Sequence, residues 1–214
     1  MITYSFYEYI FISQIYIIVI DLMSREFILE KWQLGVHDKI FQNSGGDSMP
    51  KKALVAYATW AGSTAEIAER IAKILHDESM EVEVKPAREM KSLEGYDAVI
   101  LGTPIRMGRP HPETLNFVRR FRKELPNLKL AFFVACLNMS EDNQQSRIQT
   151  EGYLKPLYRV SPGIKPVSTG LFAGVMDASK LKGFWKFAMS RTLQGDFRKW
   201  EKITAWAKSS KYSL

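Results

Sequence analysis

The hydroxyl-rich segment Thr59–Thr64 has the composition of an anion-binding loop. It reads Thr-Trp-Ala-Gly-Ser-Thr, so three hydroxyl side chains and one glycine occupy six residues without a charge among them. An apolar run over residues 53–58 precedes it, and an amphipathic stretch that predicts a helix begins near Thr64. Such a loop can bind a phosphate through backbone N–H groups and hydroxyls, and the helix dipole supplies positive potential without a lysine.

Three phosphate-binding motifs compete for this strand–loop–helix unit. A Walker A loop requires Gly-Lys-Ser/Thr, and no lysine is present. A dinucleotide fingerprint requires three spaced glycines, and only Gly62 is present. The third motif, Thr/Ser-x-x-Gly-x-Thr after a first strand, is that of the flavodoxins, and Thr59, Gly62 and Thr64 resemble it. A short loop with a Ser/Thr helix cap is the alternative that needs no ligand.

The remaining reactive residue types point to no second chemistry. The chain has one cysteine, Cys136, which excludes an internal disulfide and a Cys-x-x-Cys redox pair. Cys136 ends an apolar run, so we expect a buried strand residue rather than a nucleophile. The histidines His37, His76 and His111 lack metal-ligand spacing, and we expect no metal site.

Strand and helix patterns alternate along residues 49–214. We expect strands at 53–58, 81–85, 97–103, 129–136 and 167–173, and helices from about 64 to 75, 111–125, 146–158 and 197–208. The alternation predicts an α/β fold in which a doubly wound, five-stranded parallel sheet of order 2-1-3-4-5 has helices on both faces. In the last helix, we expect Phe197, Trp200, Ile203 and Ala207 to face inward.

In that strand order a ligand binds at the carboxyl ends of strands one, three and four. The loops there are 59–64, 103–111 and 137–143. In the second loop, Ile105 and Met107 are suited to pack against a flat ring, and Arg106 is suited to the N1/O2 side of a reduced flavin. The third loop offers Asn138 and backbone amides to a pyrimidine edge. Taken singly, each loop also fits an ordinary turn with solvated side chains. The expected cofactor-binding residues are Thr59, Trp60, Ala61, Gly62, Ser63, Thr64, Thr103, Pro104, Ile105, Arg106, Met107, Gly108, Leu137, Asn138 and Met139.

Over residues 52–208 the chain resembles flavodoxin-type protoporphyrinogen dehydrogenases, the quinone-linked family of haem synthesis. The family's second loop has the form Ser/Pro-Ile-Arg-x-Gly-x-x-His, and residues 104–111 match it. A polar insertion corresponds to residues 138–158, and the family's C-terminal motif is similar to residues 195–200. The resemblance implies non-covalent FMN that passes electrons from a substrate to a quinone. Met107 stands where flavodoxins often carry a stacking aromatic residue, and Trp60 is the candidate replacement.

The resemblance assigns no acid/base residue, and Arg106 and His111 are the only candidates. A flavodoxin-like electron carrier without a substrate of its own is the alternative function. A receiver domain would instead need acidic residues where Thr59 and Thr103 stand.

Charge is distributed unevenly along the chain. The formal net charge is +7, and residues 151–214 hold twelve basic and four acidic residues. A basic and aromatic stretch there carries Lys180, Lys182, Lys186 and Arg191, which suits peripheral contact with an anionic membrane or a carboxylate-bearing substrate. A solvated helix is the alternative. We expect a cytoplasmic protein, with the inner face of the cell membrane as the surface for that contact, and no nucleic-acid partner.

Residues 1–48 differ in composition from the remainder. They hold three basic and six acidic residues, whereas residues 49–214 carry the balance of +10. The apolar run Ile10–Ile20 is shorter than the ~20 residues of a spanning helix. Met49 and Pro50 precede a basic pair and a strand, and Gly-Gly-Asp upstream is what an in-frame ribosome-binding sequence would encode. We expect 1–48 to be an over-extended gene start, with a membrane-associating extension as the alternative, and 49–214 to be the FMN-binding domain.

Overall fold

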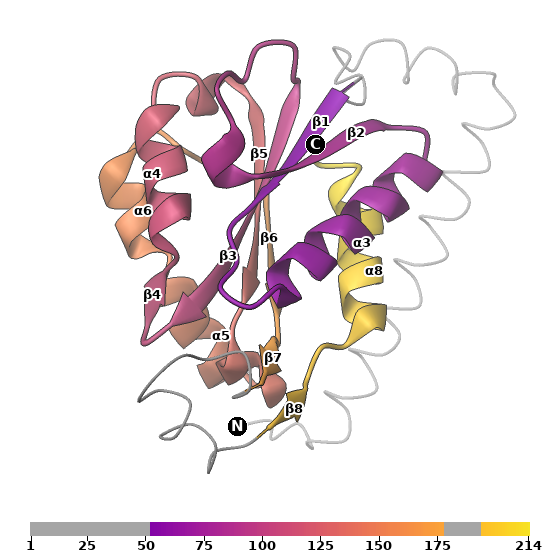
Figure 1. Cartoon of the computed structure of the whole chain (residues 1–214), viewed down its shortest axis with the longest axis vertical. Coiled ribbons are helices and arrows are strands. Elements are labelled where there is room, and N and C mark those ends of the chain that lie inside the picture. The colour runs from indigo at the N-terminus through magenta and orange to yellow at the C-terminus, as the bar shows by residue number, and fades with distance from the viewer. Residues whose placement is uncertain (1–51, 178–193) are drawn as a thin grey trace, which may run out of the picture. The chain divides into compact units, whose positions relative to one another are not determined.

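A computed structural model describes residues 52–177 and 194–214 (Figure 1). The expected boundary at Met49 lies outside these residues and stays a prediction. The basic positions Lys180, Lys182, Lys186 and Arg191 also lie outside them.

Five parallel strands form the central sheet. They are β1 (Lys52–Tyr57), β2 (Glu81–Pro86), β3 (Ala98–Arg106), β5 (Lys129–Ala135) and β6 (Ser168–Phe172). Their order is β2-β1-β3-β5-β6, which is the predicted 2-1-3-4-5 order when the short β4 (Arg109–Pro110) is left out. The predicted fold class is therefore confirmed.

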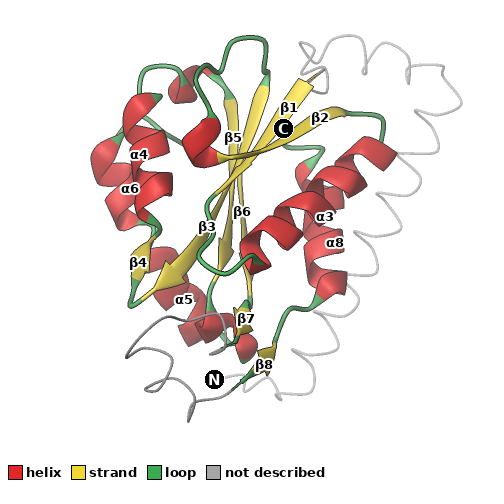
Figure 2. Cartoon of the chain, in the orientation of Figure 1, coloured by secondary structure: helices red, strands yellow, loops and turns green. Residues whose placement is uncertain are grey.

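Helices cover both faces of the sheet (Figure 2). On one face lie α3 (Ser63–Asp77) and α8 (Trp200–Ser210), and on the other lie α4 (Pro112–Arg120) and α6 (Lys155–Val160). Successive strand residues point to opposite faces, so Ile100 packs with the α3–α8 core and Leu101 with the α4–α6 core. Shorter elements are η1 (Ala87–Glu89), η2 (Leu125–Asn127), η3 (Leu137–Ser140), α5 (Gln144–Gly152), β7 (Val175–Met176) and β8 (Gly195–Asp196).

The expected loop 103–111 is mostly a β-hairpin. Strand β3 continues to Arg106 and pairs antiparallel with β4, with Ile105 opposite Pro110. The two turn residues, Met107 and Gly108, have φ of 51° and 71°. Positive φ at both central residues is the geometry that suits a tight hairpin.

Three predicted helices have different limits. The helix expected over 111–125 is α4, which ends at Arg120 with Phe121 as its C-cap. The segment expected as one helix over 146–158 forms α5 and α6, because Pro156 in the first turn of α6 has no N–H to continue the preceding helix. The last helix begins at Trp200 rather than Phe197. Phe197 packs against the α4–α6 core whereas Trp200 packs against the opposite core, so the prediction that they share one helical face is wrong.

Candidate functional site

A cavity of about 510 Å³ lies where β1, β3 and β5 end. In Figure 1 this is the lower edge of the sheet, near α5, β7 and β8. Its lining residues come from five segments of the chain and are Trp60, Ala61, Ser63, Pro104, Ile105, Arg106, Met107, Gly108, Ala135, Cys136, Leu137, Asn138, Tyr153, Gly174, Val175 and Met176. The three loops that the strand order singled out therefore meet at one hollow.

The loop after β1 presents an uncapped helix start to this region. Thr59 Oγ1 accepts a hydrogen bond from the Gly62 N–H at 2.9 Å, which closes the loop. Gly62 is the N-cap of α3 with φ of 96° and makes no side-chain cap hydrogen bond. Thr64 is fully buried, and no partner for its Oγ1 exists among the described residues. Because an unpaired buried hydroxyl is costly, this helix start fits a bound phosphate.

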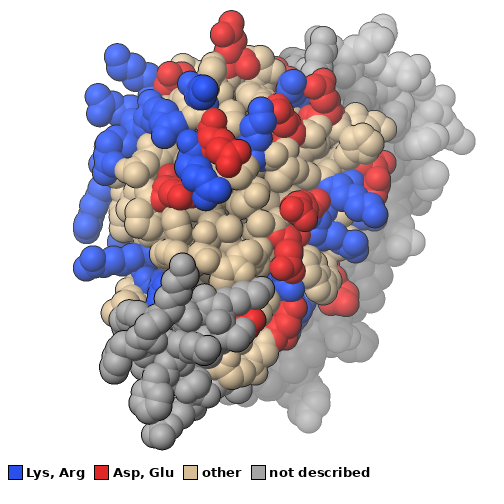
Figure 3. All heavy atoms as spheres, viewed as in Figure 1, with Lys and Arg blue, Asp and Glu red and all other residues tan. Residues whose placement is uncertain are grey.

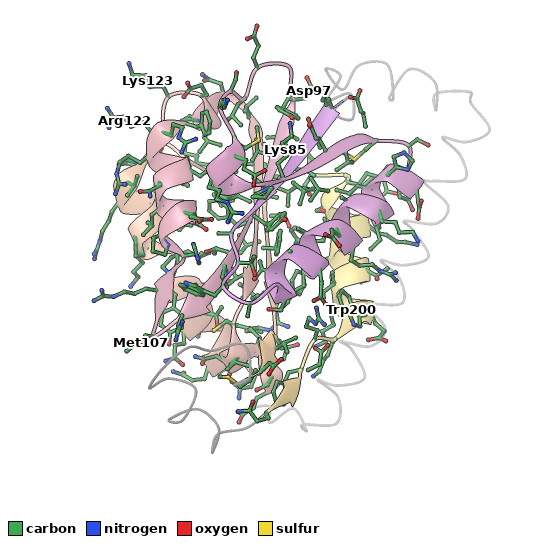
Figure 4. All side chains as sticks on the ribbon, viewed as in Figure 1. Lys85, Asp97, Met107, Arg122, Lys123 and Trp200 are labelled. Carbon is green, nitrogen blue, oxygen red and sulfur yellow. The ribbon has the colours of Figure 1, made fainter. Side chains whose placement is uncertain are left out.

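The hairpin and the first loop form one wall. Arg106 places its guanidinium carbon 5.7 Å from the centroid of the Trp60 ring. Trp60 is 41% exposed, and its ring centroid lies 4.4 Å from that of His111. Met107 is 75% exposed at the hairpin tip, where Figure 4 shows it on the periphery of the molecule. An indole, a guanidinium and aliphatic side chains at one mouth suit a flat, partly anionic ring.

Residues of η3 and α5 form the opposite wall. Asn138 Nδ2 donates to Gln149 Oε1 at 2.9 Å and to the Tyr153 hydroxyl oxygen at 3.4 Å. Tyr153 Cε1 in turn lies 3.1 Å from where a Cβ on Gly108 would be. The polar insertion thus reaches across the cavity to the hairpin.

An ion-pair network holds the β7–β8 ribbon beside the start of α3. The Arg198 side chain, only 8% exposed, donates to Asp196 and to Glu66, each at 2.6 Å. Glu66 lies in the first turn of α3, where its carboxylate would repel a phosphate. Pairing with Arg198 offsets that charge, and the same pair fixes the ribbon that carries Val175 and Met176.

Most of the expected cofactor-binding residues line the cavity, and five do not. Met139 and Thr64 are buried, and Thr59 and Gly62 are joined to each other by a hydrogen bond within their own loop. The Thr103 hydroxyl accepts hydrogen bonds from the His111 N–H and the Thr114 hydroxyl. Sequence reasoning missed the lining residues Ala135, Cys136, Tyr153, Gly174, Val175 and Met176. Gly174, directly after the last strand, was the available signal for the ribbon.

Two titratable side chains near the cavity, those of His111 and Cys136, are held neutral. His111 caps α4, because its Nδ1 accepts a hydrogen bond from the Glu113 N–H, and it is not among the lining residues. Burial lowers the pKa of His111, so the imidazole is uncharged at neutral pH with its proton on Nε2. Burial also raises the pKa of the Cys136 thiol, which disfavours the thiolate.

Basic side chains gather on the α4 and α6 side of the molecule (Figure 3). Exposed members of that group are Arg119, Arg120, Arg122, Lys123, Lys155 and Arg159.

None of the helices in residues 52–177 and 194–214 has the length and hydrophobicity that crossing a bilayer requires.

Comparison with known proteins gives a consistent set of relatives. The flavodoxin domain family matches residues 54–199. A protoporphyrinogen IX dehydrogenase [quinone] of Escherichia coli K12 is 22% identical over 169 residues, which are 76% of this chain and 92% of that protein. A protein of the same name from Leishmania major is 28% identical over 135 residues, 60% of this chain and 56% of that protein. The crystal structure of oxidised flavodoxin 2 from Bacillus cereus superposes with a TM-score of 0.50 at 18% identity, covering 76% of this chain and 99% of that one.

Proposed function

The chain belongs to the flavodoxin domain family, and from that membership we propose that it is an FMN-dependent oxidoreductase of the protoporphyrinogen dehydrogenase type. It takes electrons from a reduced tetrapyrrole and passes them to a quinone. FMN is the cofactor of this flavoprotein family. The observation that carries the proposal is the uncapped start of α3 beside a cavity with a polar and an apolar wall. The names of the distant relatives supply the substrate class.

Different residues would bind the two ends of FMN, its phosphate and its ring. The α3 start, with Ser63 and Thr64, would hold the phosphate. Trp60 and Ile105 would pack on the ring, and Arg106 would stabilise negative charge at its pyrimidine side. The bound flavin supplies two-electron chemistry, and the protein positions it and excludes water.

An electron carrier that reduces a protein partner is the second candidate. The likeness to a flavodoxin supports the same fold and leaves this alternative open. The two functions differ in turnover, because a carrier would not oxidise a small-molecule donor.

Absorption and turnover of the purified full chain test the proposal. We expect a yellow protein that releases FMN on denaturation and oxidises protoporphyrinogen IX with a quinone as acceptor. A protein that stays colourless after reconstitution with FMN would contradict the flavin site. FMN binding with reduction of an acceptor protein only, and no porphyrinogen turnover, would establish the carrier.

Peripheral membrane contact through Lys180, Lys182, Lys186 and Arg191 remains part of this proposal. Reversing Lys182 and Lys186 to Glu should weaken binding to anionic vesicles well over tenfold, since each basic residue near such a leaflet contributes about 1 kcal/mol. FMN affinity should not change. Vesicle binding that resists both the reversals and added salt would show that these residues only face solvent.

A further inference from the structure

A second hollow opens directly beside the cofactor cavity. Its volume is about 690 Å³, and it lies between η3, α5 and the β7–β8 ribbon. The two hollows share the lining residues Leu137, Asn138, Tyr153 and Met176. A molecule in the second hollow would therefore contact the same side chains as a ring in the first.

Neutral hydrogen-bonding groups dominate one side of this hollow. Asn143, Gln145 and Gln149 carry side-chain amides, and Ser140 carries a hydroxyl. Tyr153 and Phe197 add aromatic rings. A flat ring with polar groups at its edge matches this combination.

Charge narrows the class of ligand further. Among the described residues that line the hollow, Glu141 is the one carboxylate, and none is a lysine or an arginine. A ligand with carboxylates of its own would be repelled by Glu141 and would find no compensating cation among these described residues. The hollow thus suits a neutral ligand better than a tetrapyrrole with propionates.

Amide side chains suit both redox forms of a quinone. A quinone presents two carbonyl acceptors, and its two-electron, two-proton reduction turns these into two hydroxyl donors. The Gln145 amide offers both an acceptor oxygen and donor N–H groups. Gln149 adds donor N–H groups, while its Oε1 already accepts from Asn138, so these two residues can satisfy either form. No residue has to change its protonation state between the two.

We propose that the hollow lined by Gln145, Gln149 and Phe197 is the binding site for the quinone acceptor. The inference rests on the proposed function and assigns the acceptor to residues of this chain. The electron donor would then approach the cofactor from elsewhere along the cavity mouth.

Adjacent glutamines of α5 allow a matched test. Gln144 and Gln145 are both exposed, and only Gln145 lines the hollow. The FMN-loaded full chain is kept oxidised, so that no electrons are available, and 1,4-naphthoquinone binding is measured by calorimetry. We expect Gln145→Leu to weaken binding about three- to tenfold, as the loss of one neutral hydrogen bond would. Gln144→Leu should bind quinone as the wild type does, and both variants should keep wild-type FMN affinity.

The charge argument has its own test. The wild type should bind 1,4-naphthoquinone more tightly than the negatively charged 1,4-naphthoquinone-2-sulfonate. Glu141→Gln should reduce the ratio of these two affinities. Equal quinone binding by Gln145→Leu and Gln144→Leu, or displacement of FMN by the quinone, would overturn the site. If either result is found while the wild type still reduces quinone in turnover, the proposed function stands and only the assignment of the quinone site is wrong. A wild type that binds quinone at this site without any porphyrinogen turnover would contradict the function alone.

Discussion

Removing one hydroxyl should separate cofactor affinity from fold stability. Thr64 is completely buried, and its Oγ1 has no hydrogen-bond partner among residues 52–177 and 194–214. Valine has almost the same shape and lacks the hydroxyl. We therefore expect Thr64→Val to leave the packing of α3 intact and to weaken FMN binding.

In Thr64→Val the affinity for FMN should fall, whereas the stability of the cofactor-free protein should stay the same or rise. A hydrogen bond to a charged group contributes about 1.5–3 kcal/mol, so losing one to the phosphate should weaken FMN binding roughly 10- to 150-fold. An unsatisfied buried hydroxyl costs about 1–3 kcal/mol, so the cofactor-free variant should be at least as stable as the wild type. Thr64→Ser, which keeps the hydroxyl, should retain FMN affinity and lose stability through the missing methyl group.

Fluorescence titration with FMN and with riboflavin measures the first effect, and urea unfolding of the apoprotein measures the second. Riboflavin lacks the phosphate, so its affinity should hardly change in Thr64→Val. Wild-type FMN affinity in the valine variant would refute the phosphate role of Thr64. A clear fall in apoprotein stability would show that the hydroxyl already has a partner in the fold.

Three further predictions concern the walls of the site. Gly108→Ala should lower the free energy of unfolding by about 1–2 kcal/mol, because φ is 71° and the new Cβ would lie 3.1 Å from the Tyr153 ring; an unchanged urea midpoint would show that the hairpin relaxes freely. Burial lowers the pKa of His111 in the fold, so the unfolded chain takes up a proton first as pH falls below about 6.5. Stability should therefore drop between pH 7 and pH 5. His111→Asn keeps a capping side chain and should flatten this pH dependence when unfolding is measured at several pH values. An equally steep curve would show that other groups cause the pH dependence. Arg198→Ala should lower the free energy of unfolding by about 1–3 kcal/mol, because charged hydrogen bonds are lost. It should also weaken FMN binding, because Glu66 loses its partner. Thermal unfolding measures the first effect and FMN titration the second, and unchanged FMN affinity would show that Arg198 does not support the site.

The sequence by itself determined the strand order and the end of the sheet that holds the site. Both follow from local patterns, since apolar runs separated by amphipathic helices permit few right-handed arrangements. The anion-binding loop was recognisable in the sequence because its residue types, Thr59, Gly62 and Thr64, stand within one short segment before a helix. The position of the cavity then follows from parallel strands that share one carboxyl edge.

Only the tertiary structure decided which distant segments complete the walls. Tyr153, Val175 and Met176 carry no local signal, because ordinary residue types become lining residues only when the chain returns to the sheet edge. Phe197 shows the same limit, since its spacing from Trp200 matched one helical face whereas packing sends the two rings to opposite cores. The network of Arg198 with Glu66 joins residues 132 positions apart. Contacts at that separation depend on the packing of whole elements, which periodicity along the chain does not record.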